Sequence, residues 1–104
     1  MAVLDPDLLR SVATQLMSGD SVEVKGEQLR VRRTSTQRLR TVSFTMNGRE
    51  YQAIEQNPAK PSRWGRLAGN GHQVVQFKDA QTNRFVAVAV DGDVIEYGRR
   101  GHVK

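Results

Sequence analysis

The chain has 104 residues, 38% of them hydrophobic and 26% charged, and it contains no cysteine. This length suits one domain, and a chain without cysteine has neither disulfides nor cysteine-ligated metal sites. Sixteen lysines and arginines against eleven acids give a formal charge of +5. No apolar run reaches the roughly 18 residues of a membrane span, and the acidic start lacks the features of a secretory signal. We therefore expect a soluble, cytoplasmic, basic protein with no membrane partner.

The N-terminal segment predicts an amphipathic helix. Asp5 is a favourable N-cap, and Pro6 suits the first helical position. Gly19 is predicted to end the helix in a left-handed conformation. An apolar stripe recurs at helical spacing at Leu8, Leu9, Val12, Ala13, Leu16 and Met17. A helix of this length needs a surface to pack against, and the strands that follow can provide it.

From residue 21 onward the period of the pattern changes to two, which is typical of strands with one buried face. Val22 and Val24 begin this alternation, and a turn is predicted at Gly26-Glu27. In the next strand Arg30 and Arg32 alternate with apolar residues. We therefore expect both arginines on one exposed face.

The next strand is predicted over 38–46, and it meets the hairpin signal Asn47-Gly48. A two-residue turn at that point places Phe44 opposite Tyr51. The same register predicts an ion pair between Arg40 and Glu55 at the rim of the sheet.

The second half of the chain predicts a break in the sheet, a short helical turn and three more strands. Two prolines within 56–61 cannot donate to a strand ladder. The helical turn is expected over 63–68, and the strands over 73–78, 84–90 and 94–97. Asp91-Gly92 would form a second hairpin that pairs Val88 with Ile95. In the strand over 84–90, apolar residues occupy both odd-numbered and even-numbered positions from 85 onward, which indicates that the strand is covered on both faces.

Together these patterns predict an α+β fold in which an N-terminal amphipathic helix packs on a strongly bent antiparallel sheet or small barrel. The sheet would have about seven short strands, with a short central helical turn. We expect a single α+β domain over residues 1–98 and a basic C-terminal tail over residues 99–104.

The sequence gives no motif for an enzyme, a cofactor or a metal. His72 and His102 lack the spacing of a metal site, and we expect His72 to be structural or merely exposed. Asp91 and Asp93 flank a hairpin turn that favours acids for backbone reasons. We therefore predict a non-enzymatic protein without cofactor or metal. A small-ligand pocket in the mouth of a barrel is a further class, which nothing in the sequence demands.

The basic residues predict where a partner would bind. Residues 28–48 contain five arginines and no acid, and arginine presents a planar fork of donors suited to phosphate. Trp64 stands between cations, as in a base-stacking platform, or it plugs one end of the sheet. We predict sequence-independent nucleic-acid binding through an arginine-rich β face. The contact residues would be Arg30, Arg32, Arg33, Arg38, Arg63, Trp64 and Arg66.

Two other interpretations of the same charges stay open. The arginines would also serve simply to keep an exposed edge strand soluble. The alternative function is a protein-interaction domain, or a homo-oligomeric assembly such as a homodimer, that uses an exposed sheet edge. A nucleic-acid binder predicts that the arginines converge on one face, whereas an assembly domain predicts an uncovered edge or an exposed apolar patch.

Overall fold

A computed structural model describes residues 5–98 of the chain, and the predicted tail over 99–104 lies outside them. The elements in chain order are α1 (Pro6–Ser18), β1 (Ser21–Val24), β2 (Glu27–Arg30), β3 (Arg32–Arg33), β4 (Arg40–Met46), β5 (Arg49–Glu55), α2 (Arg63–Gly69), β6 (Val74–Asp79), β7 (Phe85–Val90) and β8 (Asp93–Tyr97). The predicted α+β fold, with an N-terminal helix on a bent antiparallel sheet and a short second helix, is confirmed.

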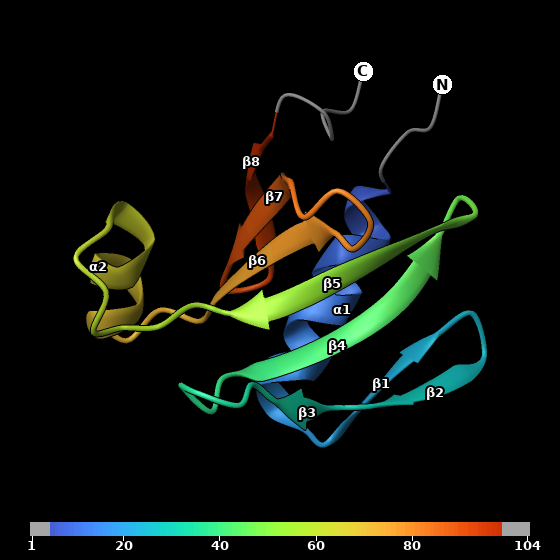
Figure 1. Ribbon diagram of the computed structural model, residues 1–104, viewed down its shortest axis with the longest axis horizontal. Helices are drawn as coiled ribbons and strands as arrows, with labels where there is room; N and C mark the ends of the chain where they lie inside the picture. Colours follow the sequence, from blue (N-terminus) through green and yellow to red (C-terminus); the bar gives the residue numbers. More distant parts are fainter. Residues whose placement is uncertain (1–4, 99–104) are drawn as a thin grey trace.

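Six strands form one antiparallel sheet in the order β3-β4-β5-β6-β7-β8, and β1 and β2 form a separate hairpin. In Figure 1 the large sheet is strongly twisted, and α1 lies behind β4 and β5. The small-barrel alternative is wrong, because closure would require pairing between β3 and β8, the two edges of this order. The described strands number eight rather than seven. The extra break comes at Val31, whose N–H donates to the carbonyl of Asp20 between β2 and β3 (2.9 Å).

The helix α1 begins as predicted and ends differently. The Asp5 carboxylate accepts hydrogen bonds from the backbone N–H groups of Asp7 (3.0 Å) and Leu8 (3.3 Å), so it caps the first turn. Gly19 has φ −160° and ψ −171°, which is extended backbone, so the predicted left-handed stop is wrong. The helix ends because the chain turns directly into β1.

The core lies between α1 and the facing side of the sheet. From α1 the buried residues are Leu9, Val12, Ala13 and Leu16. They belong to one cluster with the sheet residues Val42, Phe44, Met46, Tyr51, Ala53, Val75, Phe77, Val86, Ala87 and Ala89. In β7 the residues from Val86 to Ala89 are all buried, which confirms a strand covered on both faces.

The β4–β5 hairpin has the predicted register, with Phe44 opposite Tyr51 around the Asn47-Gly48 turn. The predicted Arg40–Glu55 ion pair is wrong. The Glu55 carboxylate accepts from the backbone N–H of Arg40 (2.9 Å), whereas the Arg40 guanidinium donates to the carbonyl of Met17 (3.0 Å). Arg40 therefore satisfies a free carbonyl in the last turn of α1 and ties that helix to the sheet.

Two other turn predictions need correction. The first hairpin turns at Lys25-Gly26, both with positive φ, instead of Gly26-Glu27. In the last hairpin, Asp91-Gly92 is the turn, but Val88 pairs with Glu96 because a β-bulge shifts the register. The bulge leaves Ile95 50% exposed, so an apolar residue expected to pair in the sheet faces solvent.

Candidate functional site

The predicted contact residues divide between two regions of the molecule. They lie at the end of β2 (Arg30), on β3 (Arg32, Arg33), in the turn before β4 (Arg38) and on α2 (Arg63, Trp64, Arg66). The regions approach each other where residues of the β3–β4 loop and of the segment before α2, including Lys60, line one depression. The arginines thus gather toward one end of the molecule, but they do not lie side by side along one strand.

The arginines of β3 and the following turn do not share one face. Arg32 pairs with Thr41 and Arg33 with Arg40, so their side chains leave the strand in opposite directions. The Arg33 guanidinium donates to the carbonyl of Arg38 (3.1 Å) and so braces the turn. Arg38 has φ +56° and lies in this turn, so the prediction that it begins a strand is wrong.

The α2 residues are held by contacts within the protein. The guanidinium carbon of Arg63 lies 4.6 Å from the centre of the Trp64 ring, and the same side chain forms an ion pair with Glu96 of β8 (3.5 Å). Trp64 is half-buried. These contacts join α2 to β8 and place a cation over one face of the indole; Arg63 and Arg66 are both exposed, and Arg66 has no ion-pair partner among residues 5–98.

The side of the six-stranded sheet that faces away from α1 is named here the open face. Its register places a row of side chains across all six strands: Arg32, Thr41, Ile54, Gln76, Val88 and Glu96. A second row contains Ser43, Gln52, Lys78 and Phe85. Thr41 and Val88 of the first row are buried and Glu96 is an acid at the β8 edge, so the accessible part of this face offers Ser43, Gln52 and Gln76 between the cations Arg32 and Lys78.

Two depressions lie on the open face. One, of about 310 Å³, is lined by Arg30 and Arg32 together with Thr41, Ser43 and Gln52. The other, of about 230 Å³, lies between the β3–β4 loop and the segment before α2 and contains Lys60 and Lys78. The Thr41 hydroxyl donates to the carbonyl of Ala53 (2.9 Å) and accepts from the Gln52 amide (3.1 Å), so the floor between the depressions is fixed by hydrogen bonds.

Sequence reasoning missed Lys60 and Lys78 as site residues. The parity of the strand 73–78 would have indicated Lys78, because it shares a face with Gln76 and opposes the buried Phe77. Lys60 belongs to the basic cluster around Trp64 in the sequence, but its approach to the open face depends on the fold of an irregular segment around two prolines.

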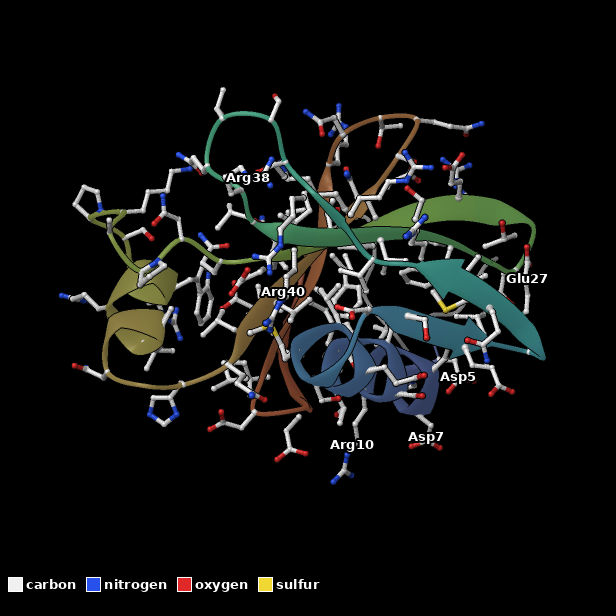
Figure 2. The ribbon with its side chains drawn as sticks, turned by 90° about the horizontal axis from the view of Figure 1, so that it is seen from below. Asp5, Asp7, Arg10, Glu27, Arg38 and Arg40 are labelled. Atoms are coloured by element: carbon white, nitrogen blue, oxygen red, sulfur yellow. The ribbon has the colours of Figure 1, made fainter. Side chains whose placement is uncertain are left out.

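Asp5 and Asp7 lie at the start of α1, on the other side of the sheet, whereas Glu96 belongs to the open face and Glu55 lines the depression that contains Lys60 and Lys78. Figure 2 shows Asp5, Asp7 and Arg10 along α1, and Arg38 on the opposite side, on the loop between β3 and β4. Arg10 forms an exposed ion pair with Asp93 (3.8 Å). Within residues 5–98, no acid lies within ion-pair distance of the open-face cations Arg30, Arg32, Lys60 and Lys78. These four charges are therefore available to a partner.

The acids with perturbed pKa values are engaged in turns. Backbone donation from Gln73 and the hydrogen bond from His72 (2.8 Å) hold the pKa of Asp91 below its usual value. For Asp79, burial raises the pKa, but hydrogen bonds from Arg49 and from two backbone N–H groups outweigh it and the pKa is lowered. The carboxylates of Asp79 and Asp91 thus stabilise loop geometry. For Asp91 this agrees with the turn role expected from the sequence, and His72, which is exposed, contacts it there.

Within the described part of the chain, no group of three or more potential metal-ligating side chains comes together. Neither α1 nor α2 has the length and apolar character required to cross a membrane. No protein-family model matches the chain, and neither a curated protein nor a solved structure matches it.

Proposed function

We propose that this protein is a non-enzymatic module that binds nucleic acid through the open face. The observation that carries the proposal is a group of cations: Arg30, Arg32, Lys60 and Lys78 border this face without an acid partner among residues 5–98, and Asp5 and Asp7 lie at the start of α1 on the far side. A polyanion is the partner that such a surface attracts most strongly. The proposed site of action is the cytoplasm.

The character of the open face favours contacts to the phosphate backbone over contacts to bases. Its neutral polar members are threonine, serine and glutamine, and Phe85 is the one aromatic member of the two rows and is half-buried. Base stacking requires exposed aromatic rings, which this face does not offer. Phosphate contacts carry no direct sequence information, so binding should be largely independent of sequence.

These contacts lead us to revise the proposed contact set. Arg30 and Arg32 remain, and Lys60 and Lys78 join them. Arg38 and Arg66 lie at the margin as exposed cations. We leave out Arg63 and Trp64, because they engage each other and Glu96, and Arg33, because it donates to the β3–β4 turn.

The test is a set of single charge reversals read by fluorescence anisotropy with labelled mixed-sequence DNA and RNA. Arg32→Glu and Lys78→Glu each change one open-face cation, and Arg10→Glu makes the same change of net charge on α1. At about 150 mM salt we expect each open-face reversal to weaken binding by about fivefold to tenfold, and Arg10→Glu by less than about twofold.

Equal losses from Arg10→Glu and Lys78→Glu would show that binding follows net charge alone, and the proposed face would then be wrong. Absence of binding by the unmodified protein at about 150 mM salt would overturn the proposal itself.

A further inference from the structure

A groove opens between β2 and β4, beyond the point where β3 ends. β3 pairs with β4 only at Thr41 and Arg40, and β1 and β2 belong to a separate sheet. Figure 1 shows β2 and β4 diverging from β3 toward their hairpin turns. A cavity of about 470 Å³ lies between them, with Leu29 on one side and Ser43 on the other. Both residues also line the neighbouring depression that contains Arg30 and Arg32, so the two cavities adjoin.

The register shows that both walls of this groove carry unpaired backbone groups. Thr34 donates to the carbonyl of Leu39, and Arg32 opposes Thr41, so the odd-numbered residues of β4 turn their N–H and C=O groups toward β3. Ser43 and Thr45 keep this orientation, but they lie beyond the two residues of β4 that pair with β3. Their backbone groups therefore face the groove.

The same argument applies to the opposite wall. Val31 donates to the carbonyl of Asp20, and Val22 opposes Leu29, so the odd-numbered residues of this strand bond toward β1. Gln28 and Arg30 turn their backbone groups away from β1, toward the groove. Parts of β2 and β4 lie within 8 Å of each other between Cα atoms, whereas a strand between two others needs about 10 Å, so a segment in the groove would pair with both walls only where they have diverged.

The edge of β4 also lacks the features that protect the other edges of the sheet. β3 is short and consists of two arginines, and β8 carries a bulge at Ile95 and two acids. Ser43 and Thr45 are exposed and uncharged, and they lie in a regular stretch of strand. Bulges, short length and charge are the devices that prevent strand pairing, so their absence favours pairing here.

The shape of the groove selects its occupant. The hairpin of β1 and β2 forms the far wall, so the edge of another sheet, with neighbouring strands of its own, does not fit, but an isolated extended segment does. The groove is closed at one end, where β3 pairs with β4. A peptide entering from the open end must therefore finish inside, next to Arg30 and Arg32, whose side chains have no acid partner among residues 5–98.

We propose that this groove binds the extended C-terminal segment of a partner protein, which pairs with Ser43 and Thr45 of β4 and places its terminal carboxylate near Arg30 and Arg32. A cation there would exclude a terminal ammonium group and favour a carboxylate. The peptide would run antiparallel to β4, and its alternate side chains would lie against Leu29 and Val24. The open end contains Glu27 and Glu50 beside Lys25, which favours a basic residue several positions before the terminus.

The test uses a synthetic peptide, acetyl-Lys-Val-Thr-Val-Thr-Val with a free carboxylate, titrated into the isotope-labelled protein and followed by amide chemical shifts. We expect shifts and slowed hydrogen exchange at Gln28, Arg30, Ser43 and Thr45. The C-terminal amide of the same peptide should bind about threefold to tenfold more weakly. A peptide N-methylated at the amides that face β4 should lose binding, because its side chains are kept but its donors are gone.

Variants of the protein provide a second test. Thr45→Pro removes one N–H from the groove wall without removing a β4–β5 hydrogen bond, and Thr45→Ala keeps the N–H as the matched control. Only the proline variant should lose the peptide, provided that both variants melt like the unmodified protein. Binding that tolerates N-methylation or amidation, or shifts located elsewhere, would overturn this proposal.

This inference depends on the backbone edge of β4 and shares Arg30 and Arg32 with the proposed nucleic-acid site, but the failure of one proposal can be distinguished from the failure of the other. Thr45→Pro should leave oligonucleotide affinity unchanged, because phosphate does not pair with a strand edge. Lys78→Glu should weaken the oligonucleotide and leave the peptide unaffected.

Discussion

Gly65 controls how α2 is joined to the segment that precedes it. Its N–H donates to the capping hydroxyl of Ser62 (3.0 Å), and it is the buried residue of the helix. A β-carbon at this position would lie 2.1 Å from the carbonyl oxygen of Lys60, a backbone atom that can move only with its segment. The glycine therefore permits a close approach that a larger residue would forbid, although it weakens the helical pattern in the sequence.

We predict that Gly65→Ala destabilises the protein by about 1–3 kcal/mol, because the segment around Lys60 must shift. Gly69→Ala is the matched control, since its β-carbon would lie at an ordinary 3.5 Å from the carbonyl oxygen of Pro58. Urea unfolding measures the free energy of unfolding of both variants. Equal stability of the two variants would contradict the close approach seen at Gly65.

Asp91 links the stability of the last hairpin to pH. Its carboxylate accepts from the backbone N–H of Gln73 (2.9 Å) and contacts Nδ1 of His72 (2.8 Å). These contacts hold its pKa below the usual value of 3.8. The stabilisation is present above that unfolded-state value and is lost as the pH falls through the lower folded-state pKa.

Asp91→Asn should therefore destabilise the protein at about pH 6, and the difference from the unmodified protein should shrink below about pH 4. Urea midpoints measured across this range provide the test. A difference that stays constant with pH would show that the carboxylate charge contributes nothing to stability.

At the scale of elements, the β4–β5 hairpin depends on its turn. Asn47 and Gly48 have φ of +55° and +78°, a region that alanine adopts only with strain. We expect replacement of both by alanine to cost about 1–3 kcal/mol and to leave Gln81→Ala, a change in another exposed loop, near neutral. Thermal melts followed by circular dichroism would detect this. An unchanged midpoint would contradict the turn geometry.

The sequence was sufficient for those elements whose signal is local. Asn47-Gly48 fixed both the turn and the register of β4 with β5, and the Asp5-Pro6 cap located the start of α1. Ile95 could not be predicted, because a bulge depends on how β8 packs against its neighbours and has no residue signature here. The partner of Arg40 was missed for a similar reason, since Met17 lies 23 residues earlier in the chain.

The candidate site was predictable in part, for the same physical reason. Alternation along 29–32 identified Arg30 and Arg32 as exposed, and both line a depression on the open face. Sequence spacing did not show that Lys60 approaches that face, because tertiary structure brings it there. Nor did it show that Arg63 is already engaged by Trp64 and Glu96.

At the scale of the whole molecule, the distribution of charge matters more than the total of +5. Asp5 and Asp7 lie at the start of α1 (Figure 2), and the open face on the other side of the sheet carries cations that have no acid partner among residues 5–98. A polyanion that approaches such a molecule is steered toward one side of it. Net charge without this segregation would give binding that is spread over the surface.

The most direct measurement is an amide chemical-shift titration of the isotope-labelled protein with a short mixed-sequence oligonucleotide at about 150 mM salt. We predict that the shifted amides cluster on the open face, around Thr41, Gln52 and Gln76, and that α1 is unaffected. Shifts spread evenly over the surface, or centred on α1, would contradict the account, as would a spectrum that does not change.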